Sequence, residues 1–572
     1  MQARRHVQAE RDPHQAPAIE TAMNTEPMHL VQYSTALGAL AALIYYVAPY
    51  LLDPYDYRRR FPGPPLAGLT NWWMSSVVRA GNHSEVVWRL HEKYGTFVRL
   101  GPNHISIADP DALEAVYGHG SGVLKSDFYR SFQSGPKANV FDTSDKIEHS
   151  KKRKRLANIF SPQNVTAFEP RVRSHIRQLC AQWDLRCEEA ARGFSGVNWV
   201  SNSGQAVMNV CAQLSYLAFD IIGDLALGSP FRLIQAQKDS SLSIESVDAS
   251  GEPVLGAVEI PVIKTLADSG RDIVTLGVFP LWTRKFLQLL PWNISGVADR
   301  MSLVKLAQAS VDARLKRGSR KNSEDAKHSI DLIDKLLEAR NEDGNPLSFD
   351  ELWAEALLLI IAGSDTTSNT LGSLCYHLAI YPEIQRELQS ELDKHIPYSS
   401  LNENNSKEGL VIPPYDAIAN YDDIKSLPYL NACVKEALRI HSTVGTGMPR
   451  VVPPGKSITV AGQTFKAGSV ISVPLYTTNR SSVWGSDASE FRPGRWLEDN
   501  AQSLNKYFVP FSIGPRACVG RNLAYMDLLL ISATLFRRYE FKALPTTKMV
   551  IHETFARGAA HCEVAIHRRT TS

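Results

Sequence analysis

The segment FSIGPRACVG, residues 511–520 near the C-terminus, constrains the fold of this chain more than any other part of it. It holds one cysteine, Cys518, in a frame of aromatic, glycine and arginine residues. A cysteine thiolate that is axial to haem pushes electron density onto the iron and favours O–O cleavage. The alternative is a buried structural cysteine beside a turn, the usual situation of a single cysteine. The combination of scarce residue types at fixed spacing favours Cys518 as the metal ligand of haem b (iron protoporphyrin IX).

The residues around Cys518 suit the environment that such a ligand needs. Phe511 can shield the sulfur from water, and Gly514 lets the backbone come close enough to direct N–H groups at it. Arg516 can pair with a haem propionate, and Gly520 gives clearance for a following helix. We therefore expect Phe511, Gly514, Arg516 and Gly520 to contact the cofactor.

With this segment the chain resembles the cytochrome P-450 family of haem-thiolate monooxygenases. The resemblance covers nearly all of residues 60 to 560, and the phrases DDIKSLPYLNACVKEALRIHS and MPRVVPPG are similar to fungal microsomal members. It implies a mainly α fold with small β-sheets in one large domain. The rest of the sequence agrees with this fold. A hairpin is predicted at residues 98–107 and a second β region at 457–473, and helical periodicity dominates between them.

A capping box at Ser348 and Glu351 begins an unusually long apolar run. Residues 352–362 are apolar except for Glu355, so the helix is predicted to be buried through the centre of the fold. If it continues to Tyr381, it spans roughly 50 Å at 1.5 Å per residue.

The middle of that helix reads AGSDTT, residues 362–367. Ala362 and Gly363 remove side-chain bulk where a haem face could approach, and Thr366 can bond back to the carbonyl of Ala362. Alone, such a cluster is more often a packing notch or a kink. Its position before Cys518 matches the acid–alcohol pair of the family, so the resemblance implies that Asp365 and Thr366 are catalytic and manage the protons of oxygen activation.

Further residues are implied by the resemblance to hold the haem propionates. His149 and Arg153 are four residues apart on one helical face, and Arg450 lies in the weaker motif GMPRVVP. The basic residues between and beside the first two are interpreted either as a docking patch for an acidic flavoprotein or as a solvated basic face; they are Lys151, Lys152, Lys154 and Arg155.

Glu436 and Arg439 lie three residues apart in VKEALRIHS, a spacing that by itself stabilises a helix only slightly. Arg495 stands where the family has a second arginine. We expect these three side chains to form a structural cluster that fixes the segment leading to Cys518.

The substrate pocket is expected, by analogy with the family, at four segments. They are the loop of residues 128–141, residues 444–447, residues near Phe555, and the stretch 231–263. Their apolar or small residues indicate a hydrophobic organic substrate of modest size.

Residues 30–52 carry no charge and are long enough to cross the hydrocarbon layer of a membrane. Arg58, Arg59 and Arg60 follow, which places that side in the cytosol. A cleaved signal peptide and a buried core helix are the alternatives. The expected organisation is a disordered segment at 1–29, a single-pass anchor at 30–52, a basic and proline-rich hinge at 53–66 and the monooxygenase domain at 67–572.

Composition excludes several other classes of protein. The net charge of +3 over 572 residues gives no sign of nucleic-acid binding, which needs a concentrated basic surface. The seven scattered cysteines do not have the paired spacing of a disulfide framework, and this favours a reducing compartment.

Taken together, the sequence predicts a membrane-anchored monooxygenase on the endoplasmic reticulum, facing the cytosol. The resemblance implies electrons from NADPH through a partner flavoprotein reductase, and a role in secondary-metabolite biosynthesis. Two other functions stay open: peroxide rearrangement or dehydration on the same fold, and a non-enzymatic haem-binding sensor.

Overall fold

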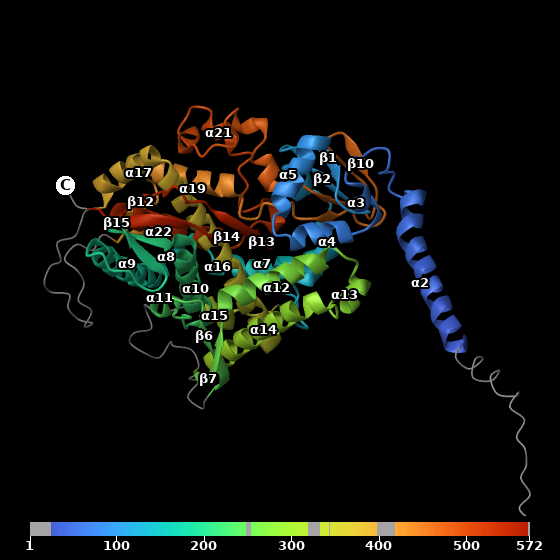
Figure 1. Cartoon of the computed structure of the whole chain (residues 1–572), viewed down its shortest axis with the longest axis horizontal. Helices are drawn as coiled ribbons and strands as arrows, with labels where there is room; N and C mark the ends of the chain where they lie inside the picture. The colour runs from blue at the N-terminus through green and yellow to red at the C-terminus, as the bar shows by residue number, and fades with distance from the viewer. Residues whose placement is uncertain (1–24, 248–252, 318–331, 342–343, 397–417, 570–572) are drawn as a thin grey trace, which may run out of the picture.

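The computed structural model describes residues 25–247, 253–317, 332–341, 344–396 and 418–569. Helix α2 (Thr25–Leu52) stands away from the body of the protein (Figure 1). The disorder expected for residues 1–29 is wrong for 25–29, which are helical; residues 1–24 lie outside the described ranges.

The body of the protein is mainly helical, as expected. Its longer helices are α9 (Glu169–Ala191), α10 (Val210–Leu227), α12 (Val262–Gly277), α14 (Pro291–Arg317), α16 (Phe349–Ile380), α17 (Pro382–His395), α19 (Pro428–His441) and α22 (Arg521–Arg538). Shorter helices are α3 (Pro65–Leu69), α4 (Trp72–Arg79), α5 (His83–Tyr94), α6 (Ala112–Tyr117), α7 (Lys146–Ile159), α8 (Pro162–Thr166), α11 (Leu233–Ala236), α13 (Leu281–Leu287), α15 (Leu332–Glu338), α18 (Tyr421–Ile424), α20 (Leu475–Thr478) and α21 (Ala501–Leu504). Single 3-10 turns are η1 (Asp127–Ser131), η4 (Ser482–Trp484), η5 (Pro493–Trp496) and η6 (Gly514–Arg516).

The strands form small sheets at the edges of the helical body. They are β1 (Phe97–Arg99), β2 (His104–Ile107), β3 (Leu124–Lys125), β4 (Trp199–Asn202), β5 (Gln205–Asn209), β6 (Ser241–Val247), β7 (Pro253–Ile260), β8 (Arg450–Val451), β9 (Ile458–Val460), β10 (Gln463–Phe465), β11 (Val470–Ser472), β12 (Tyr539–Lys542), β13 (Val550–Glu553), β14 (Arg557–His561) and β15 (Glu563–Arg568). The largest sheet has the order β1-β2-β11-β8-β3, and the next has the order β12-β15-β5-β4. The pairs β9–β10, β13–β14 and β6–β7 complete the set within the described residues.

Both β regions predicted from the sequence are present. Strands β1 and β2 pair antiparallel with Val98 opposite Ser106. The second region holds β9, β10 and β11, and its turns contain Gly462 and Gly468 at φ 74° and 83°, values that favour glycine. Strands β3 to β8 and β12 to β15 were not predicted, because their short segments give a weaker periodic signal than the helices.

Helix α16 begins where the capping box predicts and crosses the middle of the body (Figure 1). Ser348 Oγ accepts the N–H of Glu351 at 3.3 Å, and Glu351 Oε2 accepts the N–H of Ser348 at 3.3 Å. Its 32 residues span about 48 Å at 1.5 Å per residue. Most of its side chains are buried, so α16 is the central helix that the sequence predicted.

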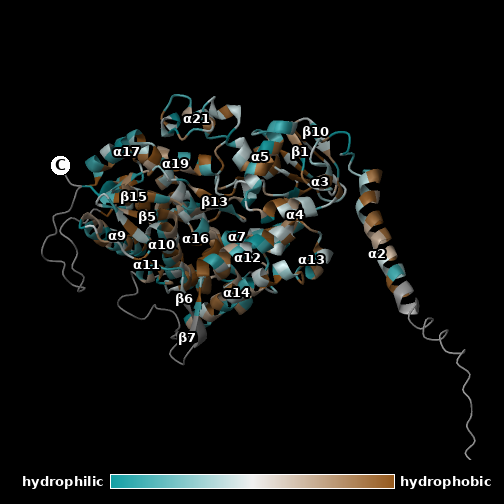
Figure 2. Ribbon diagram, viewed as in Figure 1, coloured by the Kyte–Doolittle hydropathy of each residue, from teal (hydrophilic) through white to brown (hydrophobic). Residues whose placement is uncertain are grey.

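Helix α2 is apolar along most of its length (Figure 2), and its segment Leu30–Leu52 is 0% buried by the rest of the protein. Helix α10 is also long and apolar enough to span a membrane, but 83% of it is buried, so it is a core helix. The difference in burial, rather than hydropathy, separates a candidate anchor from a core element.

An exposed apolar patch lies beside the anchor helix, on α13 and the start of α14. Its members are Trp282, Phe286, Leu289, Trp292 and Ile294, each more than half exposed. The ring of Trp282 meets that of Tyr45 of α2 edge-on, with centroids 5.6 Å apart. Helix α2 and this patch therefore belong to one apolar surface.

Candidate active site

Cys518 lies between η6 and α22, in a segment fixed by backbone hydrogen bonds. Its N–H donates to the carbonyl of Phe511 at 2.8 Å. Cys518 is exposed, whereas the other six cysteines are buried. Surrounding protein raises the pKa of the Cys518 thiol by desolvation, while the Gly520 N–H and the Arg153 charge act in the opposite direction. Among the seven cysteines, this is the one whose sulfur is available to an external group.

The glycines of the segment allow close backbone packing. Gly514 has φ +69°, and a Cβ there would lie 2.3 Å from the carbonyl oxygen of Tyr117. Gly520 is the N-cap of α22, and a Cβ there would lie 4.0 Å from the sulfur of Cys518. Gly514 thus fixes the turn against the chain after α6, and Gly520 leaves space beside the sulfur.

Phe511 and Arg516 flank the cysteine in the expected segment. The ring of Phe511 packs on that of Tyr525, with centroids 4.9 Å apart. Arg516 donates to the carbonyl of Thr143 at 2.8 Å, in the loop before α7. Arg516 therefore joins the cysteine segment to the loop that carries the next two candidates.

Four basic side chains gather beside this segment. Arg450 is buried and donates to the hydroxyl of Tyr129 at 2.7 Å, and Arg153 donates to the carbonyl of Ala517. Among the described residues, no carboxylate lies within ion-pair distance of the four cations, which are Lys125, Arg153, Arg450 and Arg516. The cluster is positive and, within the described residues, lacks anionic partners.

His149 and Lys125 are buried within that positive cluster. Burial, with the charges of Arg516, Lys125 and Arg153, lowers the pKa of His149 to about 3. His149 is therefore neutral at pH 7 and is limited to a hydrogen-bonding role. The ammonium of Lys125 lies 4.2 Å from the centre of the Phe141 ring, and burial lowers its pKa well below the usual value. Lys125 was not among the sequence candidates; its signal is a lone lysine in an otherwise apolar strand, VLK.

These observations fit a haem as the bound group. An accessible cysteine supplies a soft thiolate ligand for iron. The positive cluster supplies charge for two propionates, which would offset the cost of burying its cations. Arg153 donates to the carbonyl of Ala517 beside Cys518, and Arg516 precedes Cys518 by two residues and donates to the carbonyl of Thr143, so the ligand and the positive cluster are structurally joined.

The middle of α16 carries the second candidate pair. Thr366 Oγ1 donates to the carbonyl of Ala362 at 2.8 Å, as the sequence predicted. Burial raises the pKa of Asp365 to about 7. Ala362 is exposed, although it lies in a helix that is otherwise mostly buried. This part of α16 therefore faces open space with a hydroxyl and a titratable carboxyl beside it.

The role expected for Gly363 is wrong. A Cβ at Gly363 would lie 2.7 Å from Cδ1 of Ile222 on α10. The missing side chain therefore serves the contact between α10 and α16, and Ala362 alone provides the accessible small residue on this part of the helix. Sequence gives the two small residues but not the side of the helix on which each one lies.

A cavity of about 130 Å³ adjoins Asp365 and Thr366. Most of its wall is apolar, with Phe132, Phe141, Trp353, Leu357, Ile361 and Phe555 among its lining residues. The loop 128–141 and Phe555 were predicted here correctly. The stretch 231–263 was expected to line the pocket, but none of its residues lines this cavity. Most of it forms α11 and the β6–β7 hairpin, and the cavity wall comes instead from later residues of α12. Residues 444–447 do not line this cavity.

Glu436, Arg439 and Arg495 form the buried cluster that the sequence predicted. Arg439 donates to both carboxylate oxygens of Glu436, at 2.9 and 2.7 Å. Arg495 donates to Glu436 at 3.0 Å, and so does the indole of Trp496. Hydrogen bonds from Arg439 and the charges of both arginines outweigh desolvation and lower the pKa of Glu436. The cluster ties α19 to η5, well before the cysteine segment in sequence.

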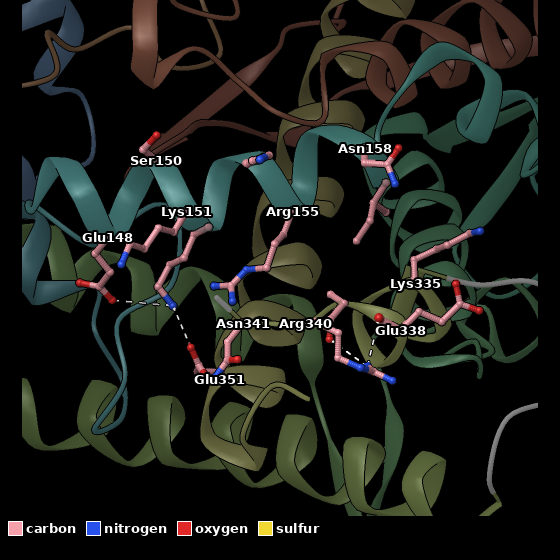
Figure 3. Close-up of a pocket in the computed structure, with 14 residues that line it drawn as sticks. Glu148, Ser150, Lys151, Arg155, Asn158, Lys335, Glu338, Arg340, Asn341 and Glu351 are labelled. Carbon is pink, nitrogen blue, oxygen red and sulfur yellow. Dashed lines mark hydrogen bonds and ion pairs between the residues drawn. The ribbon is translucent and has the colours of Figure 1, made fainter. Parts of the chain in front are cut away.

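The basic residues of α7 point in two directions. Lys152 is 3% exposed and lies 3.7 Å from carboxylates of both Glu351 and Glu355, so it faces inward. Lys151 and Arg155 line a cavity of about 840 Å³ between α7, α15 and the start of α16 (Figure 3). Part of the predicted basic patch is thus accessible, and Lys152 is a buried ion-pair partner instead.

The thiolate segment, the central helix and the helical fold define the class of protein. The family model of cytochrome P-450 matches residues 62–560, so the chain belongs to the cytochrome P-450 family. Its fold is that of the family: two solved cytochrome P-450 structures superpose with TM-scores of 0.66 and 0.67 at 18% and 16% identity, and they cover 85% and 89% of this chain and 98% of theirs.

Among curated relatives, the chain is similar to benzoate 4-monooxygenase of Aspergillus niger. The two are 37% identical over 94% of this chain and 98% of the relative. Pisatin demethylase of Fusarium vanettenii is 27% identical, over 85% of each chain. The chain is accordingly a monooxygenase of a haem family with fungal relatives.

Proposed function

We propose that this chain inserts one oxygen atom from O₂ into a small, largely apolar organic substrate, with Cys518 as the ligand of its haem iron. The cofactor, when bound, supplies oxygen activation, and the protein supplies orientation and protons. One observation carries the proposal: Cys518 alone among the cysteines is accessible, and it is joined to a positive cluster suited to propionates. Lys125, His149, Arg153, Arg450 and Arg516 hold those carboxylates, and Phe511, Gly514 and Gly520 shape the surroundings of the sulfur.

Protons reach the reacting centre through Asp365 and Thr366. The Asp365 carboxyl gains and loses a proton close to neutral pH, because burial raises its pKa to about 7. Thr366 holds its hydroxyl proton against the carbonyl of Ala362 and can turn it toward the cavity. The two side chains therefore act as proton reservoir and proton donor beside the substrate.

Electrons come from NADPH through a flavoprotein reductase that docks on the basic face of α7. Lys151, Lys154 and Arg155 supply positive charge there, beside the accessible cavity of Figure 3. Positive side chains steer an acidic partner by long-range attraction. Arg153, on the same helix, contacts the backbone next to Cys518, which gives a short route between the docking face and the iron ligand.

The protein is anchored in the endoplasmic reticulum membrane by residues 30–52, with the catalytic domain in the cytosol. The support is an unburied apolar helix followed by three arginines, and an apolar patch around Trp282 that shares its surface. Residues 53–66 link this anchor to the domain at 67–572, although Pro65 already belongs to α3.

Small aromatic compounds are the first substrates to test, because the chain is 37% identical to a benzoate 4-monooxygenase and its cavity is lined by aromatic rings. The role in secondary-metabolite biosynthesis stays a prediction. Peroxide rearrangement and a sensor function are disfavoured by the Asp365 and Thr366 pair, since neither needs a proton supply for O₂ cleavage.

Replacement of the proposed ligand tests the function. Cys518→Ser is expected to remove the red-shifted Soret band of the reduced, carbon monoxide-treated protein and to abolish NADPH-dependent oxidation. Cys433→Ser, at a buried cysteine of α19, is the control and should keep the band. A band that survives in Cys518→Ser would refute the assignment, and turnover in the absence of a reductase would refute the electron route.

A further inference from the structure

One arginine lies in the wall of the mostly apolar cavity. Arg300 lies on α14 and lines the cavity together with Ser134. Its Nε donates to Ser134 Oγ at 3.1 Å, and its Nη2 donates to the carbonyl of Gln133 at 2.5 Å. These two bonds fix the guanidinium in place, and Nη1 has no protein acceptor among the described residues.

The nearby carboxyl of Asp142 does not neutralise Arg300 by a direct ion pair. No carboxylate lies within 4 Å of Arg300 in the described part of the chain. Oδ1 of Asp142 accepts the N–H of Asn139 at 2.8 Å instead, and burial raises the pKa of Asp142 to about 7. Asp142 is thus only partly charged at neutral pH, and Arg300 retains the capacity to bind an anion.

Arg300 lines the same cavity as the reacting pair, Asp365 and Thr366. Ser134, its partner, precedes Gly135, and a Cβ at Gly135 would lie 2.3 Å from the ring of Trp353. Between Trp353 and Thr366 in the sequence, α16 contributes the apolar side chains of Leu357, Leu358 and Ile361 to the same wall. The cavity therefore brings together a guanidinium, apolar side chains and the pair Asp365 and Thr366.

We propose that Arg300 binds the carboxylate of an aromatic acid substrate and holds the opposite end of the molecule toward Asp365 and Thr366. This proposal rests on the monooxygenase function proposed above and names the substrate class of that site. The guanidinium matches a carboxylate in planarity and in the spacing of its donors. Lys137 also lines the cavity and adds positive charge to its wall. The cavity thereby selects acids over neutral aromatic compounds of equal size.

Binding spectra of the haem-loaded protein test this selection without turnover. Benzoate and benzamide have nearly the same shape but differ in charge, and each is titrated while the substrate-induced Soret shift is recorded. The full-length protein is expected to bind benzoate about ten- to a hundredfold more tightly, the range for a hydrogen bond between charged groups. Phenylacetate and its amide form a second pair, in which the acid is longer by one methylene group.

Arg300→Gln is expected to remove this preference, so that acid and amide bind within about threefold of one another. Arg300→Lys keeps the charge but not the paired donors, and should retain part of the preference. Lys137→Gln, at an exposed position, should reduce the preference less than Arg300→Gln. Because the readout is a ratio of two ligands in the same protein, a general loss of packing in a variant does not imitate the result.

Each outcome decides the matter. Equal affinity of the full-length protein for the acid and amide of both pairs overturns the carboxylate proposal, and so does an unchanged ratio in Arg300→Gln. If those amides or other neutral aromatic compounds still bind and are oxidised, the monooxygenase function stands although the carboxylate proposal fails. If Arg300→Gln does not load haem, the ratios of the full-length protein and of Arg300→Lys decide. Loss of the red-shifted carbon monoxide band in the full-length protein would instead reject the proposed function itself.

Discussion

Asp365 and Thr366 are neighbours in the chain and share one cavity, yet they contribute different chemistry. The carboxyl of Asp365 is half-buried, and desolvation by the surrounding protein raises its pKa to about 7. The hydroxyl of Thr366 is bonded within the helix, to the carbonyl of Ala362. A side chain of the same size without a hydroxyl would leave the helix intact and remove only the proton donor.

The first prediction concerns Thr366→Ala. The variant should bind haem normally but form product at about one tenth of the normal rate or below, because a positioned proton donor is lost. Reducing equivalents should appear as peroxide, measured against NADPH consumption. Thr367→Ala is the control, since Thr367 is buried and does not line the cavity. Unchanged coupling of NADPH use to product in Thr366→Ala would contradict the role assigned to its hydroxyl.

The sequence predicted residues in short motifs and the bonds that they make within one helix. It did not predict contacts between side chains from elements that are distant in the chain. Thr366, Glu436 and Arg439 found the partners expected, because each bond lies within one helix. Lys125 and Arg300 are single basic residues with no motif around them. Their importance arises from burial beside aromatic rings or in a cavity wall, which depends on elements distant in sequence.

At the scale of elements, the contact between α10 and α16 sets the position of the catalytic pair. Gly363 lies two residues before Asp365, within the same turn of α16, and packs against Ile222 of α10. Long helices and their caps were predictable from periodicity and from the Ser348 capping box. The side on which each helix meets its neighbour was not, and so Gly363 was assigned to the wrong face.

The second prediction tests this contact. Gly363→Val should lower the free energy of unfolding by about 1–3 kcal/mol, because the new side chain overlaps Ile222. In a protein that already carries Ile222→Ala, the loss of unfolding free energy caused by Gly363→Val should be smaller by at least about 1 kcal/mol. Gly38→Val is the control, as a helical glycine with no atom within 4 Å of its Cβ position. Denaturant unfolding measures the free energy of each variant. If Gly363→Val destabilises the protein equally with and without Ile222→Ala, then α10 does not restrict the size of the side chain at position 363.

At the scale of the whole molecule, α2 and the patch around Trp282 form one apolar surface that is separate from the core. The sequence predicted the helix from its length and lack of charge. It did not predict the patch. Trp282 and Phe286 lie on the short helix α13 and Trp292 lies at the start of α14, and the sequence does not show which side of these helices stays exposed in the folded chain.

The third prediction is that the patch binds membrane independently of α2. A chain without residues 1–52 should keep its haem spectrum but sediment only partly with lipid vesicles. Further replacement of Trp282 and Phe286 by serine should release it, because each large aromatic side chain contributes on the order of 2–3 kcal/mol of apolar burial. Phe194→Ser, which is 63% exposed on another part of the surface, is the control and should change nothing. If the chain without residues 1–52 no longer sediments with vesicles at all, the patch around Trp282 does not bind the membrane independently.

The position of α12 links this surface to the cavity. Its residues Leu266 and Ile273 line the cavity wall, and the chain continues from its end directly into α13 with Trp282. We therefore expect a displacement of α13 in a bilayer to move α12 and the cavity wall with it. On that expectation, the affinity for substrate differs between detergent micelles and lipid vesicles, and lipid composition affects which molecules the enzyme accepts.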